Sequence, residues 1–311
     1  MKILVTGGAG FIGSHVADAY LEAGHEVVIV DNLLTGRKEN LPANAKFVEM
    51  DIRENDITGL FEREQFDVVN HHAAQMDVRK SVEDPRFDAD INVLGSLNLL
   101  ENCVEYGVKK VIFASTGGAI YGEQDYFPAD ESHPQRPLSP YGITKLALEK
   151  YLFYYHEVHD LKYFVLRYAN VYGPRQNPHG EAGVVAIFAR ELLTDGQPVI
   201  YGDGKQTRDF VYVGDVVESN VRALEYEESD MVNIGTGMET DVNEIFRRLR
   251  DIAGKSDIPE QHADGKPGEQ RRSVISNDKA GEVLGWQPLV SLEQGLARTV
   301  EFFQNRDTRK L

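Results

Sequence analysis

The strongest constraint on the fold is a glycine-rich turn between two short apolar segments near the start of the chain. Residues 2–6 (KILVT) have the length and β-branched content of a buried parallel strand. They run directly into residues 7–13 (GGAGFIG), where glycine recurs with the spacing G-x-x-G-x-x-G. Apolar residues at helical spacing follow, and a second apolar segment, residues 27–30, ends at Asp31. This order of strand, turn, helix and strand predicts the first βαβ unit of a parallel sheet.

Each part of this unit has a physical role in binding a dinucleotide. A pyrophosphate can reach the backbone N–H groups at a helix N-terminus only where no Cβ atom blocks its approach, and the glycines of residues 7–13 meet that need. Asp31 can accept hydrogen bonds from both ribose hydroxyls of adenosine and would repel a 2′-phosphate. The unit therefore predicts NAD rather than NADP. The same glycines alone would fit an ordinary tight turn, and it is the surrounding strand, helix and acid that favour the nucleotide interpretation.

The composition is that of an ordinary globular protein, with 41% hydrophobic and 27% charged residues among 311. With 33 basic and 50 acidic residues the net charge is −17, which argues against nucleic acid or an anionic membrane as a partner. Cys103 is the only cysteine, so internal disulfides and cysteine-rich metal sites are excluded. The N-terminal apolar run is too short for a signal peptide, and no run reaches the roughly 18 residues of a membrane helix. We therefore expect a cytoplasmic protein.

Strand and helix patterns alternate through the first half of the chain. Strand patterns occur at residues 46–51, 66–71, 110–115 and 163–167, and helical patterns lie between them, including a long one at residues 91–104. Alternation of this kind predicts an α/β fold built on a doubly wound parallel (Rossmann) sheet.

The regular alternation of strand and helix patterns ends in the second half of the chain. The sequence there contains a Gly/Pro-rich loop, a helix near residues 184–193 and a hairpin signal at Asp203-Gly204. We expect residues 1–170 to form an NAD-binding domain and residues 171–311 a smaller, mixed α/β substrate domain. Strand patterns within about residues 209–235 could rejoin the first domain, so the second is expected to be discontinuous.

Polar residues gather directly after the predicted strands. In doubly wound sheets ligands bind beyond the carboxyl ends of the strands, so these residues are expected to face one crevice. They are Asp31, residues 51–52, residues 72–75, Ser115-Thr116 and residues 168–170. The two histidines at 71 and 72 have no acidic or further histidine partner at ligand spacing, so we expect no metal site.

The clearest catalytic pattern is Tyr141-Gly-Ile-Thr-Lys145. Tyr141 and Lys145 are four residues apart, so on a helix they lie on one face. A phenol with a pKa near 10 is a poor base at neutral pH, but a neighbouring ammonium group and a positive nicotinamide ring both favour the phenolate. Alone, the pattern is more often a solvated pair on a helix surface. Its place after a nucleotide motif and a strand ending at Ser115-Thr116 favours catalysis.

The order and spacing of these motifs resemble the extended short-chain dehydrogenase/reductase family and, within it, the UDP-glucose 4-epimerases. The resemblance covers nearly the whole chain. The matching segments are residues 6–13, 31–32, 51–52 and 72–75, Asn92, Ser115-Thr116 through Tyr121-Gly122, and residues 141–145, 167–176 and 208–209.

The resemblance implies a tightly held NAD that is reduced and reoxidised within one turnover. Tyr141 would take the proton from the sugar 4-OH while hydride passes from C4 to the nicotinamide, and the 4-keto sugar would turn over before hydride returns to its other face. Lys145 would hold the nicotinamide ribose and lower the pKa of Tyr141. The implied cofactor-binding residues are Gly7, Gly10, Phe11, Ile12, Gly13, Asp31, Asn32, Leu33, Thr35, Gly36, Asp51, Ile52, His72, Ala73, Ala74, Gln75, Asn92, Ser115, Tyr141, Lys145 and Tyr168.

The resemblance also implies a UDP-sugar as partner. Asn170 and Arg208 would bind the diphosphate, Arg208 as a donor fork suited to phosphate oxygens, and residues 199–201 would lie against the uracil. The implied substrate-binding residues are Thr116, Tyr141, Asn170, Gly183, Val184, Val199, Tyr201, Arg208, Lys266, Glu269 and Ser273.

One departure from the family pattern affects the catalytic hydroxyl. The position four residues before Tyr121, where a serine or threonine is expected, is Gly117. We therefore assign the role to Thr116, with Ser115 as the alternative. Gly117-Gly118 also stands where related 4,6-dehydratases carry an acid pair, so dehydration would lack its proton donors.

Substrate breadth is predicted from the segment that begins at Lys266, which departs from the arginine of the family. Alignment of this segment places Ser273 where glucose-only enzymes carry tyrosine. A serine would leave room for an N-acetyl group beside C2 of the sugar. The simpler interpretation is a small residue on a strand.

Two alternatives to a UDP-hexose 4-epimerase remain: another nucleotide-sugar enzyme, such as a UDP-glucuronate 4-epimerase, and a non-catalytic NAD-binding sensor. A sensor typically lacks the Tyr–Lys pair that this chain carries. The family usually forms dimers, so we expect a homodimer. Its two-helix face would comprise Asp90, Leu94, Leu97, Tyr151, Tyr154 and Tyr155.

Overall fold

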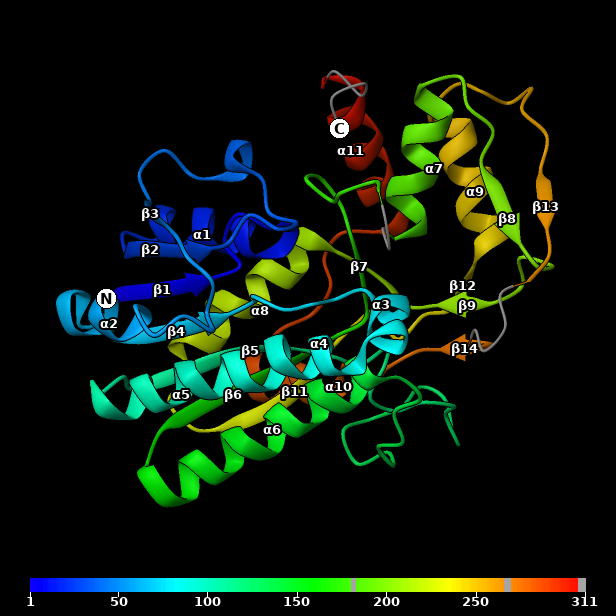
Figure 1. The fold of residues 1–311 in the computed structure, drawn as a ribbon. Helices are drawn as coiled ribbons and strands as arrows, with labels where there is room; N and C mark the ends of the chain where they lie inside the picture. Colours follow the sequence, from blue (N-terminus) through cyan, green and yellow to red (C-terminus); the bar gives the residue numbers. More distant parts are fainter. Residues whose placement is uncertain (180–182, 266–269, 307–311) are drawn as a thin grey trace.

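The computed structural model describes residues 1–179, 183–265 and 270–306. Its centre is a seven-stranded sheet in which every neighbouring pair of strands is parallel and the order is β11-β6-β5-β4-β1-β2-β3 (Figure 1). The predicted doubly wound sheet is confirmed. The strands are β1 (Lys2–Thr6), β2 (Glu26–Asp31), β3 (Lys46–Glu49), β4 (Val68–His71), β5 (Lys110–Thr116), β6 (Lys162–Tyr168) and β11 (Asp230–Ile234).

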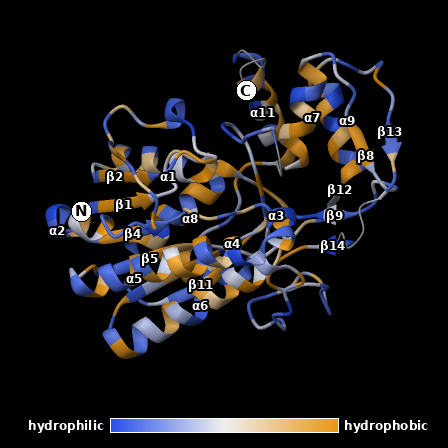
Figure 2. Ribbon diagram, viewed as in Figure 1, coloured by the Kyte–Doolittle hydropathy of each residue, from blue (hydrophilic) through white to orange (hydrophobic). Residues whose placement is uncertain are grey.

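Helices cover both faces of this sheet, which is why its central strands are almost continuously apolar (Figure 2). Ile3, Leu4 and Val5, for example, are fully buried although they point to alternating faces. One face packs against α1 (Phe11–Glu22), α8 (Val213–Glu225) and α10 (Asp278–Leu284). The other packs against α2 (Ile57–Glu64), α5 (Ser96–Glu105) and α6 (Pro140–His159).

The helical pattern at residues 91–104 is not one regular helix. Its first part is a π-helical turn, η2 (Asp90–Gly95), which leads into α5. The Ser96 hydroxyl donates to the Asn92 carbonyl at 2.6 Å, and Asn92 itself bonds residues after β4. π-turns inside helices are frequent at functional sites. The short elements around it are η1 (Lys38–Asn40), α3 (Val78–Glu83) and α4 (Pro85–Ala89).

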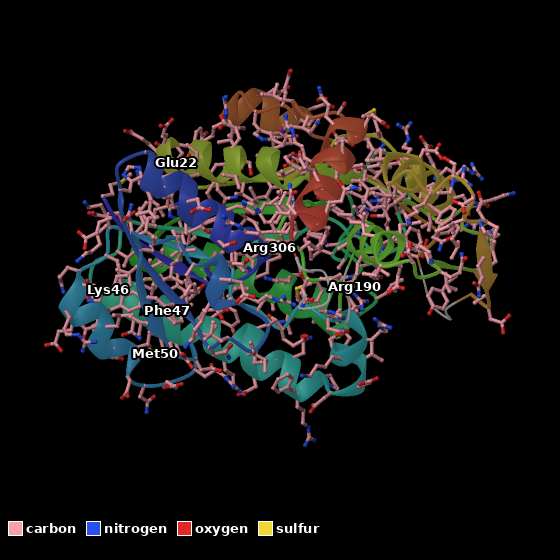
Figure 3. All side chains as sticks on the ribbon, turned by 90° about the horizontal axis from the view of Figure 1, so that it is seen from above. Glu22, Lys46, Phe47, Met50, Arg190 and Arg306 are labelled. Carbon is pink, nitrogen blue, oxygen red and sulfur yellow. The ribbon has the colours of Figure 1, made fainter. Side chains whose placement is uncertain are left out.

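The C-terminal half adds a second apolar core. It is formed by α7 (Val184–Leu193), α9 (Val242–Ile252) and α11 (Leu292–Gln304), which lie together in Figure 1. Asp241 caps α9 by accepting from the Glu244 N–H, and a complete capping box at Ser291 and Gln294 begins α11. Viewed from above in Figure 3, Lys46 and Phe47 of β3 lie on the left of the molecule and Arg190 of α7 lies to the right of them, near the middle.

The hairpin predicted at Asp203-Gly204 is wrong. The turn exists, with Gly204 at φ +68°, but the strands on either side of it pair elsewhere. β8 (Val199–Tyr201) pairs with β13 (Gln261–Ala263), and β9 (Thr207–Arg208) lies between β12 (Thr240–Asp241) and β14 (Arg272–Ser273). Asn243 on α9 fixes the turn by donating its side-chain amide to the Asp203 carbonyl at 3.0 Å. The turn is therefore held by the side chain of Asn243, and not by hydrogen bonds between the two strands of a hairpin.

Two strands that follow residue 209 pair with different sheets. β10 (Phe210–Tyr212) pairs with β7 (Asn170–Tyr172) in a separate parallel two-stranded sheet, whereas β11 returns to the edge of the large sheet beside β6. Of the strand patterns within residues 209–235, only the second therefore joins the central sheet. β7 follows β6 directly, so it carries residues from the carboxyl edge of the large sheet toward the C-terminal half.

Candidate active site

The glycine turn after β1 is closed in a way that only glycine permits. A Cβ atom added at Gly13 would lie 2.4 Å from the Gly7 carbonyl oxygen, and one at Gly7 would lie 2.6 Å from the Ala73 nitrogen. Gly7 also has φ +69°. No side chain caps the N-terminus of α1 at Gly10. The turn therefore presents backbone N–H groups and a bare, concave backbone, which is the geometry that a pyrophosphate requires.

Asp31 ends β2 beside this turn. Its carboxylate accepts from the Ala9 N–H at 3.0 Å and the Leu33 N–H at 2.8 Å, and burial raises the pKa of the carboxyl while these two bonds oppose the rise. A carboxylate has about four acceptor positions, so two remain for ribose hydroxyls. A Cβ at Gly36 would lie 2.6 Å from Asp31 Oδ1, which explains glycine there. The residues fit the adenosine half of NAD.

Asn32 and Asp51 meet at the same edge of the sheet. The side-chain amide of Asn32 donates to Asp51 Oδ2 at 2.9 Å. Arg53 also binds Asp51, and mainly for that reason the pKa of the Asp51 carboxyl is lowered to about 2. Asp51 is therefore an anion at neutral pH, which suits an acceptor of hydrogen bonds.

Residues 72–75 leave β4 next to the glycine turn. The His72 ring stacks on Tyr168, with centroids 6.3 Å apart, and burial lowers the pKa of His72 to about 3, so the ring is neutral. Gln75 and Asn92 are joined by two bonds, from Gln75 N–H to Asn92 Oδ1 at 2.8 Å and from Asn92 Nδ2 to the Gln75 carbonyl at 2.9 Å. Among the described residues no cluster of side chains could hold a metal ion.

Tyr141 and Lys145 lie in the first turns of α6, which begins with Pro140 and is capped by the Ser139 hydroxyl. Lys145 is buried, and its Nζ donates to the Ala114 carbonyl at 2.8 Å and lies 5.9 Å from the centroid of the Tyr141 ring. Burial lowers the pKa of Lys145 to about 8, although the carboxylates of Asp88 and Glu149 oppose this.

The phenol of Tyr141 is not activated by the protein alone. Burial raises its pKa above the ordinary value, and the negative charge of Asp88 adds to the rise. In this structure burial therefore outweighs the lowering of the Tyr141 pKa that we expected from Lys145. Without a further positive charge beside it, Tyr141 is a neutral phenol at pH 7.

The two candidate hydroxyls at the end of β5 have different surroundings. The Ser115 hydroxyl is buried and donates to Glu149 Oε1 at 2.6 Å. Thr116 is partly exposed. A Cβ atom at Gly118 would lie 3.8 Å from Thr116 Oγ1 and 3.7 Å from Asn170 Oδ1, so the threonine hydroxyl and the asparagine amide approach the same point. The geometry favours Thr116 as the hydroxyl that faces a substrate.

The loop after Thr116 has no room for a side chain at its first position. A Cβ atom at Gly117 would lie 2.6 Å from Ile275 Cδ1. Ile275 is buried and belongs to a small core with Ile120 and Tyr121. An acidic side chain at residue 117 would require this core to move, which agrees with the absence of the acid pair expected of a dehydratase.

The predicted sugar-nucleotide residues lie on short elements of the C-terminal half. Asn170 begins β7 and its N–H donates to the Asp209 carbonyl at 2.9 Å. Arg208 on β9 stands opposite Ser273 on β14, which is buried. Gly183 caps α7 and Val184 is its first residue, while Val199 and Tyr201 lie on β8, at the outer side of this half. Lys266 and Glu269 fall outside the described residues.

Sequence reasoning missed three buried groups behind these residues. Asp88 accepts from the Thr144 hydroxyl at 2.8 Å and from the amides of Gln75 and Asn92, and no spacing signal indicates this. Glu149 forms an ion pair with Arg167 in which the shortest distance is 2.6 Å. Glu149 lies four residues after Lys145, so helical spacing could have indicated that it shares a helix face with Tyr141 and Lys145.

The predicted dimer face is partly wrong. Tyr155 is only 8% exposed and packs in the core beneath α6 with Leu148 and Leu152, because spacings of three and seven residues place all three on the sheet side of the helix. Leu94, Tyr151 and Tyr154 are exposed.

A dinucleotide cradle at the carboxyl edge of a doubly wound sheet, with a Tyr–Lys pair beside it, defines an NAD-binding enzyme of the Rossmann type. The sequence matches the model of the NAD dependent epimerase/dehydratase family over residues 3–235, and the chain belongs to this family. The predicted family and cofactor class are thereby confirmed.

Individual relatives cover the whole chain. A UDP-glucose 4-epimerase of Mycolicibacterium smegmatis is 46% identical, with 98% of this chain and 99% of the relative covered. The crystal structure of a UDP-glucose 4-epimerase with UDP-glucose from Thermotoga maritima has a TM-score of 0.96 and 50% identity, covering 98% and 99% of the two chains. A Thermus thermophilus UDP-glucose 4-epimerase in complex with NAD has a TM-score of 0.93 and 45% identity, with the same coverage.

Proposed function

We propose that the protein is an NAD-dependent epimerase that inverts C4 of a UDP-hexose and interconverts UDP-glucose and UDP-galactose. The observation that carries this proposal is that Lys145, which lies beside the Tyr141 ring, is fixed by the carbonyl of Ala114 on β5, the strand that ends at Thr116. The relatives named above support the choice of sugar nucleotide.

The chain's own residues have separable roles in this reaction. The glycine turn and Asp31 hold the cofactor, and Lys145, fixed by the Ala114 carbonyl, orients its ribose. Bound NAD would supply the hydride acceptor and a positive charge that favours the phenolate. Tyr141 withdraws the proton of the sugar 4-OH, and Thr116 hydrogen-bonds the same oxygen and completes the proton path. Gly117, held against Ile275, leaves no acid there to eliminate water.

In this proposal the two halves of the chain bind different molecules. Residues 1–170 bind NAD, with part of residues 209–235 returning to them, and residues 171–311 bind the UDP-sugar. Asn170 and Arg208 bind the diphosphate, and residues 199–201 lie against the uracil. Ser273, a small residue opposite Arg208, supports acceptance of the N-acetyl forms as well.

We also propose that the protein forms a homodimer and is cytoplasmic. Exposed apolar side chains on η2 and α6, including Leu94, Tyr151 and Tyr154, support a homodimer, which sedimentation would test; a monomer at micromolar concentration would contradict it. Cys103 is a free, buried cysteine, and the use of a single cysteine in the chain supports a cytoplasmic protein. No helix in the described part of the chain is long and apolar enough to cross a bilayer. Fractionation of cells would test the location.

The function is tested by two measurements on protein purified without added nucleotide. Denaturation should release NAD or NADH, which chromatography identifies, and the native protein should convert UDP-glucose to UDP-galactose, which proton NMR follows at the anomeric signals. Release of mainly NADP(H), or failure to form the C4 epimer from any UDP-sugar by a protein that contains NAD, would overturn the proposal.

A further inference from the structure

A buried ion pair lies directly behind the catalytic residues, and the reaction described above does not use it. The side chains of Arg167 on β6 and Glu149 on α6 are 0% and 2% exposed. The pair is bidentate, with Arg167 Nε donating to Glu149 Oε1 at 3.0 Å and Nη2 donating to Oε2 at 2.6 Å. Burying two charges is costly unless further hydrogen bonds support them, and here each guanidinium nitrogen and each carboxylate oxygen has at least one partner.

The additional partners of the pair are the two ends of the segment that carries Thr116. At one end, the Ser115 hydroxyl donates to Glu149 Oε1 at 2.6 Å. At the other end, Arg167 Nη1 donates to the Tyr121 hydroxyl at 2.9 Å, and Tyr121 in turn donates to Asn233 on β11 at 2.7 Å. Thr116 and Gly117 are also paired with Tyr168 through the backbone, so the ion pair adds side-chain anchors on both sides of a segment whose backbone is already attached to β6.

The same carboxylate also acts on Lys145. Tyr141, Lys145 and Glu149 follow one another at four-residue spacing on one face of α6. Burial lowers the pKa of Lys145 to about 8, and the negative charge of Glu149 is one of the two influences that hold it up. Loss of that charge would leave a positive Arg167 near Lys145 and lower its pKa further.

We propose that Glu149 and Arg167 are positioning residues for the epimerisation: their bonds to Ser115 and Tyr121 hold the segment that carries Thr116, and Glu149 places a negative charge on the helix face that carries Lys145. This inference rests on the proposed function. A merely structural ion pair would stabilise the fold without affecting the ionisation of the active site, and well-packed apolar residues could replace it. The two roles therefore predict different responses to substitution.

Tyr121→Phe tests the anchor alone, because it leaves both charges in place. We expect kcat to fall by roughly 10- to 100-fold, the effect of displacing a reacting group by about 1 Å, with KM and bound NAD nearly unchanged and the pH profile unmoved. Glu149→Gln should lower kcat similarly and also move the alkaline limb of the pH–kcat profile about one unit lower.

Glu149→Gln leaves a lone buried guanidinium, so Glu149→Gln/Arg167→Met serves as a second variant without the unpaired charge. It should restore folding and return the alkaline limb toward the wild-type position, while kcat stays low because Ser115 has lost the Glu149 carboxylate and Tyr121 its bond to Arg167. Asp215→Asn is a matched control: its buried carboxylate binds the backbone N–H groups of Leu289 and Val290. It should lower stability without moving the profile.

A wild-type protein without epimerase activity would overturn the proposed function and, with it, the kinetic role of the pair. The effect on Lys145 can be followed without turnover, by NMR titration of the Lys145 Cε signal, assigned with Lys145→Met. Glu149→Gln should lower that pKa in the free protein. Unchanged kcat in folded Tyr121→Phe together with an unchanged Lys145 titration in Glu149→Gln would overturn the inference.

Discussion

Tyr141 is the residue that we propose as the general base, and its surroundings in the protein alone keep it protonated. Tyr141→Phe removes only the hydroxyl from a half-buried ring. We expect kcat to fall by about 10²- to 10⁴-fold, the usual contribution of a general base, with folding and NAD content preserved. Tyr106→Phe, at the end of α5, is the control. Retention of more than a tenth of wild-type kcat by Tyr141→Phe would show that another group takes the proton.

The neighbouring hydroxyls at 115 and 116 give an ordered prediction. Thr116→Val should lower kcat by a smaller factor than Tyr141→Phe, because we propose that the threonine only assists the proton path. Ser115→Ala should cost less again, because Ser115 faces Glu149 and not the substrate. Steady-state kcat of the three variants tests the order. If Ser115→Ala is more damaging than Thr116→Val, the catalytic hydroxyl has been placed one residue too late.

Lys145 predicts a link between activity and stability. A pKa lowered from the usual 10.5 to about 8 by burial means that the charged lysine destabilises the free protein by about 3 kcal/mol at pH 7. Lys145→Met should therefore be inactive yet more stable than the wild type. Between about pH 8 and 10.5 Lys145 loses its proton in the folded wild type before it does so in the unfolded chain, so the stability of the wild type rises with pH. The difference in unfolding free energy between Lys145→Met and the wild type therefore becomes smaller.

Urea unfolding of NAD-free wild type and Lys145→Met at pH 7 and pH 10 measures this difference in unfolding free energy. Lys150→Met, on the exposed side of the same helix, is the control and should show no such pH dependence. If the two proteins are equally stable at pH 7, or if their difference in unfolding free energy is larger at pH 10, then Lys145 is not a buried and charged residue.

At the scale of elements, strand β14 predicts the range of substrates. Ser273 stands opposite Arg208 of β9 and is buried, and we propose that a larger side chain at this position would enter the sugar site. Unmodified protein should epimerise both UDP-glucose and UDP-N-acetylglucosamine. Ser273→Tyr should selectively suppress the second, whereas Ser273→Ala should preserve both. Competition of the two sugars measured by NMR tests this, and turnover of UDP-glucose alone by the unmodified protein would refute it.

The elements that the sequence predicted best are those specified by local patterns. The strands at 2–6 and 110–115 carry continuous apolar runs, so the signal for each strand lies within the segment itself. The turn at Asp203-Gly204 was also predicted, but its strands pair with segments about 30 to 65 residues away. No local signal contains such pairings, which explains the wrong hairpin.

At the scale of the whole molecule, the candidate site is assembled from the carboxyl ends of β1, β2, β4, β5 and β6, as the parallel sheet requires. The sequence could therefore predict which loops meet. It could not predict that Glu149 and Arg167, eighteen residues apart, would support the Thr116 loop from behind, because that contact depends on how α6 packs on the sheet. It also placed Tyr155 on the surface, where only the orientation of the helix could decide.

The central claim is that a hydride leaves C4 of the sugar and returns to the same carbon within the site. UDP-glucose labelled with deuterium at C4 tests it directly, with the label in the UDP-galactose product read by mass spectrometry and NMR. We predict that the deuterium remains at C4, because the cofactor and the 4-keto sugar do not separate during a turnover. Loss of the label to water, or its appearance at another carbon, would contradict the account.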